Sequence, residues 1–180
     1  MQGIILSEFL DFAEQQVGPA AVAAIAGERG APAGERYQSM ARYDHHELLR
    51  LTHALADRQG LAADEVLRRF GRCLFGRFAA LYPLFLADAE DTLSLLAGID
   101  RYIHGELQQL YPDGEFPSFQ CRVTAPRQLE MRYESKRPFA DLAEGLILGC
   151  ADHFGERVEI SREDTSAAGR YGMRFVVTAS

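Results

Sequence analysis

The run from Leu129 to Arg137 alternates between two kinds of side chain, with the two-residue period of a β-strand. One face of this strand would begin with apolar residues and then carry three hydrogen-bond donors in a row, Tyr133, Ser135 and Arg137. The opposite face carries only charged side chains and is expected to face solvent. The run therefore predicts a strand that leaves the core with three donors on its inner face.

Donors on a face that begins as core need acceptors, because a buried donor without a partner costs free energy. The phenol of Tyr133, the hydroxyl of Ser135 and the planar guanidinium of Arg137 have no obvious carboxylate partner on that face in the local sequence. A bound anion, such as one or two ligand carboxylates, would satisfy all three donors. The alternative is a strand end that emerges into water with Arg137 solvated.

Length and charge limit the classes of protein. A chain of 180 residues with 47% hydrophobic content is expected to form one domain with a substantial core. Its formal net charge of −7 argues against a nucleic-acid or anionic-membrane partner. No apolar run approaches the ~20 residues of a membrane span, and the first residues lack the features of a signal peptide. The three cysteines form no Cys-x-x-Cys pair, so neither a zinc site nor a disulfide framework is expected. A cytoplasmic location is the expectation.

Periodicity predicts a helical first part and a mixed second part. Helices are expected over 4–17, 20–28, 44–59, 64–82, 92–110 and 139–154. Strands are expected over 119–124, 129–137, 158–160 and 173–177, with a polar loop over 161–172. The first two strands would form a hairpin. The fold class is therefore α+β with an antiparallel sheet.

Histidines supply the remaining candidate site residues. His104 lies at the edge of the apolar stripe of the helix expected over 92–110, beside the small residues Ala97 and Gly105. A bulky group could approach the helix there, or His104 could simply be half-buried or solvated. The adjacent pair His45 and His46 lies in the first turn of a helix and is expected to be solvated.

Together these residues resemble the sequence pattern of a known protein family. The Tyr-x-Ser-x-Arg run, His104 about thirty residues before it and a start reading Met-x-Gly-Ile-Ile match bacterial heme-nitric oxide/oxygen binding (H-NOX) domains, relatives of the heme domain of soluble guanylate cyclase. The resemblance covers essentially the whole chain. Further matches are Phe70-Gly71-Arg72, Pro117 and Glu144-Gly145-Leu146-Ile147-x-Gly149.

The resemblance implies a single domain over residues 1–180, with heme b (iron protoporphyrin IX) buried between a helical distal part, 1–60, and a proximal part, 61–180. The proximal part would hold a sheet of about four antiparallel strands. Tyr133, Ser135 and Arg137 would bind the heme propionates, and His104 would be the axial ligand and only protein ligand of the iron. The expected pocket residues are Ile5, Phe9, Leu74, Phe78, Pro117, Leu142 and Leu146.

Departures from the family pattern refine the implied function. Some members carry a cysteine-ligated zinc near the C-terminus, but residues 161–173 contain no cysteine, so no zinc is expected. Oxygen-binding members place a tyrosine where this chain has Leu142, and a tryptophan and an asparagine at the positions of Phe9 and Leu74. All three are apolar here. The resemblance therefore implies a sensor that binds nitric oxide and CO, excludes oxygen, and signals in trans to a histidine kinase or a diguanylate cyclase/phosphodiesterase.

Two other functions stay open. A heme-free module on the same scaffold could use Arg137 to bind a different ligand carboxylate, although it would have no need of His104. A redox enzyme or heme carrier would need acid–base groups above the iron, which the apolar set does not offer. No nucleophile motif, phosphate loop or metalloprotease motif is present, so the chain is not expected to be an enzyme.

Overall fold

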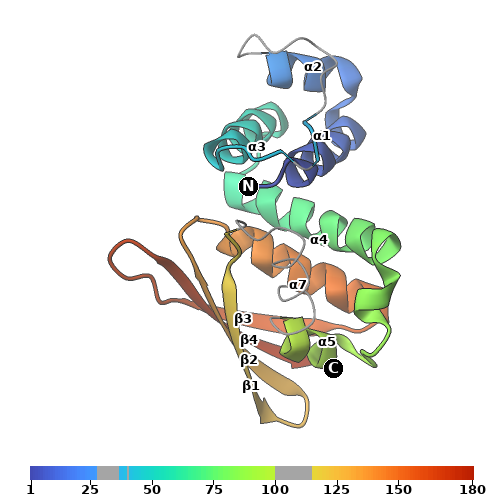
Figure 1. The fold of residues 1–180 in the computed structure, drawn as a ribbon, viewed down its shortest axis with the longest axis vertical. Coiled ribbons are helices and arrows are strands. Elements are labelled where there is room, and N and C mark those ends of the chain that lie inside the picture. Colours follow the sequence, from blue (N-terminus) through green and yellow to red (C-terminus); the bar gives the residue numbers. More distant parts are fainter. Residues whose placement is uncertain (28–36, 40, 100–114) are drawn as a thin grey trace. The chain divides into compact units, whose positions relative to one another are not determined.

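Figure 1 presents the computed structural model of the chain, which describes residues 1–27, 37–39, 41–99 and 115–180, apart from the side chain of Phe85. The chain divides into two compact units, Met1–Phe70 and Gly71–Ser180. The division falls within the helix α4 (Ala63–Leu81), so this one helix contributes to both units.

The first unit is helical. It contains α1 (Gly3–Val17), α2 (Pro19–Gly27), α3 (His46–Gln59) and the beginning of α4. α1 ends where Gly18 takes a φ of 81°, a backbone conformation that residues with a Cβ rarely adopt, and Pro19 then begins α2. These boundaries match the helices expected from the sequence to within a few residues.

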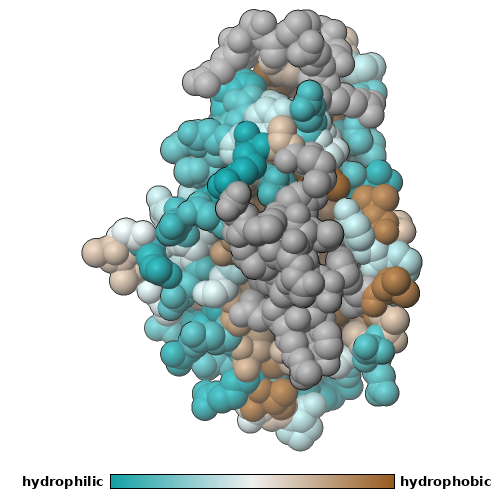
Figure 2. All heavy atoms as spheres, in the orientation of Figure 1, coloured by the Kyte–Doolittle hydropathy of each residue, from teal (hydrophilic) through white to brown (hydrophobic). Residues whose placement is uncertain are grey.

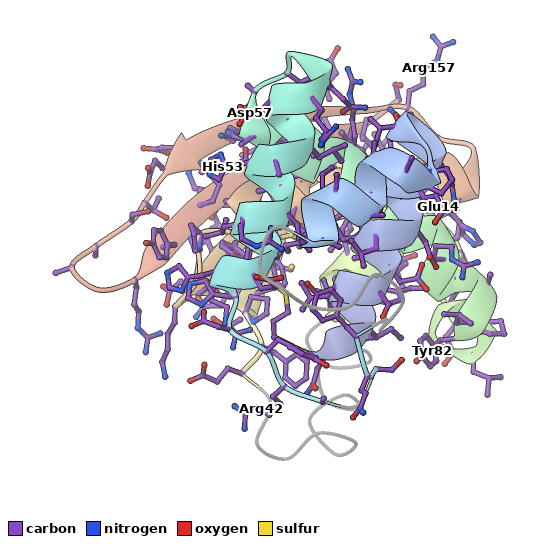
Figure 3. The ribbon with its side chains drawn as sticks, turned by 90° about the horizontal axis from the view of Figure 1, so that it is seen from above. Glu14, Arg42, His53, Asp57, Tyr82 and Arg157 are labelled. Carbon is purple, nitrogen blue, oxygen red and sulfur yellow. The ribbon has the colours of Figure 1, made fainter. Side chains whose placement is uncertain are left out.

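Apolar side chains from all four helices form the core of the first unit. The ring of Phe9 meets that of Phe70 edge to face, with centroids 5.0 Å apart. The outer helix faces are polar: Glu14 projects from α1 and the pair His53 and Asp57 from α3, all exposed (Figure 3). The core residues include Leu6, Phe9, Phe12, Ile25, Leu48, Leu51, Leu55, Val66, Leu67 and Phe70.

Hydrogen bonds anchor the first residues of the chain within the first unit. The N-terminal amino group of Met1 donates to the carbonyl oxygen of Tyr43 (2.9 Å), and the N–H of Gly3 donates to that of Ala41 (2.9 Å). Ser7 Oγ on α1 donates to the carbonyl oxygen of Tyr37 at 2.9 Å. These bonds hold α1 in place beside the segment that leads into α3.

The second unit is built on a four-stranded antiparallel sheet in the order β1-β2-β4-β3. Its strands are β1 (Ser118–Ala125), β2 (Gln128–Ser135), β3 (Val158–Asp164) and β4 (Tyr171–Ala179). The helices α5 (Thr92–Ile99) and α7 (Ala140–Phe154) cover one face of it, and the short helix η1 (Pro83–Leu86) follows α4 (Figure 1). The α+β class and the antiparallel sheet of four strands are therefore confirmed.

The covered face of the sheet forms the core of the second unit. Alternate residues of β1, β2 and β4 point to this face and pack against α5 and α7, as the two-residue period requires. The core includes Leu95, Leu96, Phe119, Leu129, Met131, Tyr133, Ala143, Ile147, Cys150, Met173, Phe175 and Val177. The apolar half of the run from Leu129 is thus buried as expected.

The expectation of a loop over 161–172 was wrong at both ends. Residues 161–164 continue β3, with Ser161 opposite Val176 of β4, and Tyr171 already belongs to β4. The polar sequence is tolerated because β3 lies at the sheet edge. There Arg162 pairs with Asp141 (2.6 Å) and Glu144 (2.5 Å) of α7. Backbone pairing with β4 and these ion pairs override the weak local strand signal.

The charged face of β2 is less solvated than predicted. Glu130 is only 9% exposed, because arginines from three strands surround its carboxylate. Arg132 and Arg174 each approach it to 3.3 Å, and Arg122 lies 3.7 Å away. This cluster connects β1, β2 and β4 on the face opposite the helices.

The surface is polar over most of the side seen in Figure 2, with apolar side chains exposed around the end of α4 and η1, where Leu81 and Leu84 lie. Within the described part of the chain, every helix is too short or too polar to cross a membrane. The helix expected over 92–110 is described as α5 as far as Ile99.

Candidate functional site

The Tyr-x-Ser-x-Arg run lies at the end of β2. Tyr133 is 2% exposed, and its ring packs against that of Phe119 on β1, with centroids 5.5 Å apart. Burial raises the pKa of Tyr133, so the phenol stays neutral and remains a donor. Ser135 is half-buried, and the Arg137 side chain is 18% exposed. The run thus leads from the core to the surface.

The strand ends at Ser135, two residues earlier than expected. The backbone N–H of Arg137 donates to Ser135 Oγ at 3.0 Å instead of to a neighbouring strand. Tyr133 donates through its hydroxyl to the carbonyl oxygen of Arg137 at 3.3 Å. These two bonds turn the chain before Pro138, which cannot donate to a strand ladder. Arg137 therefore lies on a turn and not on the strand face.

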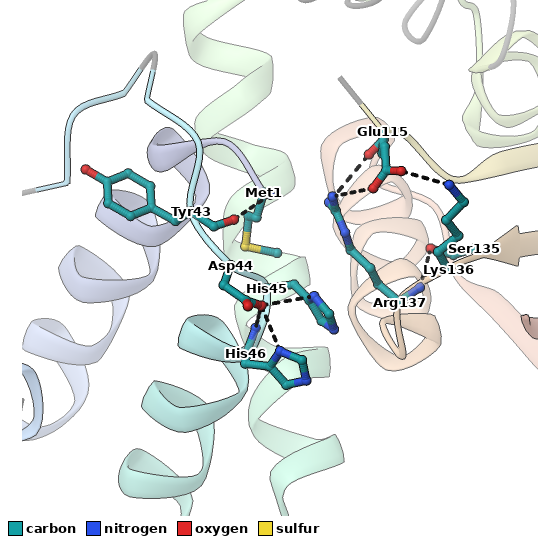
Figure 4. Close-up of polar contacts among 9 residues, drawn as sticks. All are labelled: Met1, Tyr43, Asp44, His45, His46, Glu115, Ser135, Lys136 and Arg137. Atoms are coloured by element: carbon teal, nitrogen blue, oxygen red, sulfur yellow. Dashed lines mark hydrogen bonds and ion pairs between the residues drawn. The ribbon is translucent and has the colours of Figure 1, made fainter. Parts of the chain in front are cut away.

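Arg137 has a carboxylate partner within the chain, which neither a bound anion nor a solvated Arg137, the two alternatives from the sequence, anticipated. Its Nη2 lies 3.2 Å from Oε2 of Glu115, and its Nη1 donates to the carbonyl oxygen of Glu115 at 3.4 Å (Figure 4). Lys136 Nζ lies 2.8 Å from the other carboxylate oxygen, Oε1. The hydrogen bond from Lys136 and the nearby Arg137 charge lower the pKa of Glu115, so it is ionised at neutral pH.

Glu115 and Lys136 are site residues that reasoning from the sequence missed. The signal was the hairpin itself: Ser118 pairs with Glu134, and continuing this pairing outward reaches Glu115 and Arg137. Opposite charges placed across an antiparallel pair attract each other. The register of the hairpin, which the sequence alone did not supply, is what brings them together.

The predicted apolar site residues of the second unit come from three elements. Leu74 on α4 is 1% exposed and Leu142 on α7 is 9% exposed. Phe78 on α4, Leu146 on α7 and Pro117 just before β1 are half-buried. None of these side chains carries a hydrogen-bond donor.

Two predicted pocket residues belong to the first unit: Ile5, half-buried, and Phe9, fully buried, both on α1. His104, the predicted iron ligand, lies outside the described residues, so its role stays a prediction.

A second cluster of polar side chains lies at the start of α3. Ligand atoms of Asp44, His45 and His46 lie within 4.8 Å of one another, close enough to hold a metal ion. The Asp44 carboxylate already accepts the N–H of His46 at 2.9 Å and the ring Nδ1 of His46 lies 2.7 Å away (Figure 4). Hydrogen bonds from His46 lower the pKa of Asp44. The cluster is thus explained as the start of a helix, where Asp44 accepts a backbone N–H. His46 is exposed as predicted, whereas His45, also predicted to be solvated, is half-buried.

The end of β2 is suited to bind carboxylates. A guanidinium, a hydroxyl and a neutral phenol lie within five residues of the chain, and the guanidinium already holds one carboxylate. Charge-assisted bonds of this kind are the strong ones in proteins, and the guanidinium can bind in a bidentate manner.

Comparisons with known proteins identify the family. The haem-NO-binding family model matches residues 2–162. The Fe(II) unliganded H-NOX protein of K. algicida is 29% identical, with 100% of this chain and 97% of that chain covered and a TM-score of 0.88. A point mutant of that protein is 30% identical with the same coverage and a TM-score of 0.89.

An oxygen-binding H-NOX domain related to soluble guanylate cyclases shares the fold, at 21% identity, with 100% of this chain and 95% of that chain covered and a TM-score of 0.88. No curated protein matches the chain significantly. The family model spans most of the sequence, and the solved H-NOX structures share its architecture from end to end. The chain therefore belongs to the haem-NO-binding (H-NOX) family.

Proposed function

We propose that this chain is a heme-based gas sensor that binds nitric oxide and carbon monoxide and excludes oxygen. Membership of the haem-NO-binding family supports the heme. The single observation that supports the proposal for this chain is the donor set at the end of β2, which runs from Tyr133 in the core through Ser135 to Arg137 at the surface.

These three residues fit a group that carries two carboxylates. Arg137 offers a planar fork of N–H donors, and its partial exposure leaves it accessible to a ligand. Tyr133 is buried and neutral, and Ser135 can donate through its hydroxyl while its oxygen accepts from Arg137. We propose that they hold the propionates of heme b.

His104 is the proposed axial ligand, because its position before the motif matches that of the family's ligand. A neutral imidazole is a common axial ligand of heme. When bound, the heme would supply an iron with one coordination position free for a gas. The proposed pocket residues are Ile5, Phe9, Leu74, Phe78, Pro117, Leu142 and Leu146.

Selectivity for nitric oxide over oxygen is proposed from the chain's own side chains, since an H-NOX domain with this fold binds oxygen. Leu142 on α7, Leu74 on α4 and Phe9 on α1 are buried and apolar. They offer no donor to the outer atom of bound oxygen. A site without a donor forms no hydrogen bond with bound oxygen. Bound nitric oxide and carbon monoxide gain far less from such a bond, so the affinity for oxygen is lowered selectively.

The proposed output is a signal to a separate protein. Residues 1–180 would act as one sensor domain without catalytic activity, in the cytoplasm, on a partner histidine kinase or a diguanylate cyclase/phosphodiesterase. Membership of the haem-NO-binding family supports this proposal of action in trans.

Absorption spectra test the proposal. Purified protein should show a Soret band that shifts on reduction with dithionite and again on addition of nitric oxide. Protein that takes up no heme, even when hemin is supplied, would contradict it. The alternative is then a heme-free module that binds another carboxylate. One observation favours that alternative, since Arg137 already holds the carboxylate of Glu115.

A further inference from the structure

We infer that the carboxylate of Glu115 competes with a heme propionate for Arg137, and that a bound propionate would leave Glu115 held by Lys136. This inference rests on the proposed function, because it concerns the same site. It assigns to Glu115 and Lys136 a role in setting how tightly, and how fast, the chain takes up its ligand.

The geometry shows one carboxylate shared between two cations. Oε2 of Glu115 lies 3.2 Å from Nη2 of Arg137, and Oε1 lies 2.8 Å from Nζ of Lys136 (Figure 4). The two contacts use different oxygens, so one can break while the other persists. Glu115 can therefore leave Arg137 and stay paired with Lys136.

The exposure of the three side chains indicates which contact a ligand carboxylate would replace. The Arg137 side chain is only 18% exposed, whereas Glu115 is 48% and Lys136 67% exposed. A guanidinium that is largely removed from water gains from a carboxylate partner at all times. Glu115 fills that need in this structure, and a ligand carboxylate could fill it in its place. A ligand carboxylate would therefore replace the Glu115 carboxylate at Arg137, while Arg137 itself stays largely buried.

The contact between Arg137 and Glu115 also anchors the segment that contains Pro117. Glu115 precedes Pro117 by two residues, and its backbone carbonyl accepts from Arg137 Nη1 at 3.4 Å. Arg137 therefore holds this segment through both a side chain and a backbone oxygen. Displacement of the carboxylate would remove one of these two attachments of Glu115, two residues before the proposed pocket residue Pro117.

Competition of this kind lowers apparent affinity by the fraction of molecules in which Arg137 is free. Ion pairs with exposed members stabilise weakly, so the expected effect of removing the competitor is roughly two- to fivefold in affinity. The effect should be restricted to ligands with free carboxylates.

The test measures equilibrium binding of hemin to the heme-free full chain and to its Glu115→Gln variant. Glu115→Gln should bind hemin roughly two- to fivefold more tightly. Hemin dimethyl ester, which has no free carboxylate, should bind both proteins equally. The matched control is Glu134→Gln, which removes an exposed carboxylate of β2 that pairs with Arg170 at 3.7 Å and does not contact Arg137. Glu134→Gln should leave the affinity for hemin and the affinity for hemin dimethyl ester unchanged.

A double-mutant cycle tests the role of Lys136. Lys136→Met should weaken hemin binding in the natural background, because Lys136 no longer holds the displaced Glu115 carboxylate. In the Glu115→Gln background the same substitution should have no effect. A loss of equal size in both backgrounds would show that Lys136 binds the ligand directly and would overturn its assignment.

The outcomes separate this inference from the proposed function. Unchanged or weaker hemin binding by Glu115→Gln would overturn the displacement, and so would an equal gain for the dimethyl ester. Failure of the natural chain to bind hemin would instead overturn the proposed function, and the inference with it. Circular dichroism of each variant confirms that it is folded.

Discussion

A Cβ atom added to Gly149 would lie 2.6 Å from the carbonyl oxygen of Arg72, so α7 and α4 pass each other with their backbones nearly in contact. The Cβ of Phe75 would lie 2.7 Å from the same added Cβ atom. The guanidinium of Arg72 forms a bidentate ion pair with Asp152, one turn further along α7. The crossing of these two helices therefore requires a residue without a side chain at Gly149.

Gly149→Ala should lower the free energy of unfolding by about 1–3 kcal/mol, because neither backbone can move aside easily. Urea unfolding followed by circular dichroism measures the change. Gly76→Ala on α4 is the matched control: nothing lies within 4 Å of its added Cβ, and alanine favours the helix by up to ~1 kcal/mol. Equal effects of the two substitutions would contradict the close crossing.

Cys150 should be inert in the folded protein. It is fully buried, and burial raises the pKa of its thiol to about 12. At pH 8 a thiol reagent should therefore label it only through unfolding, whereas an unfolded thiol with a pKa of ~8.5 reacts readily. Labelling of Cys150 as fast in native buffer as in denaturant would refute this.

The same shift makes stability depend on pH. Above about pH 8.5 the unfolded chain loses the Cys150 proton while the folded chain keeps it, so this contribution to stability falls until about pH 12. Cys150→Ala should show a shallower decline of unfolding free energy over that window. Identical pH profiles for the two proteins would show that the thiol does not titrate differently on folding.

His104→Gly should remove the proposed axial bond and leave heme held by the residues at the end of β2. Added imidazole should then restore the five-coordinate ferrous spectrum, because a free imidazole can enter the space of the lost side chain. The measurement is the Soret band with and without imidazole. A band that the substitution leaves unchanged would exclude His104 as the ligand.

Arg137→Ala should weaken heme retention more than Ser135→Ala. Hydrogen bonds to charged groups contribute ~1.5–3 kcal/mol and neutral ones ~0.5–1.5 kcal/mol. The difference corresponds to as much as roughly tenfold in affinity. Rates of heme transfer to apomyoglobin measure it, and Arg170→Ala, which removes an arginine 62% exposed, is the control. Equal transfer rates from the Arg137 and Ser135 variants would contradict this ordering.

Reduced protein exposed to air should form no persistent oxygen complex. Oxygen gains ~1.5–3 kcal/mol from a donor, roughly ten- to hundredfold in affinity, and Leu142 provides none. Leu142→Tyr should recover part of that affinity, and Leu142→Phe, of similar size without the hydroxyl, should not. The measurement is the visible spectrum after dithionite is removed. A stable oxygen spectrum from the natural protein would mean that another group donates.

The local sequence pattern was sufficient to predict most of the secondary structure and the three donor residues at the end of β2. α1 ends at Gly18 and the core face of β2 alternates from Leu129 to Tyr133 as expected, because these features depend on the conformations of a few adjacent residues. The family resemblance implied the roles of the site residues, which local pattern does not supply.

The sequence by itself determined which side chains are apolar, charged or donating along each element, and hence the α+β class. Only the tertiary structure decided which charges meet. Glu115 reaches Arg137 through the register of a hairpin, Glu130 is buried by arginines from three strands, and Arg162 holds an edge strand to α7. The physical reason is that propensity acts over neighbouring residues, whereas an ion pair between distant residues depends on strand register and packing that no local pattern encodes.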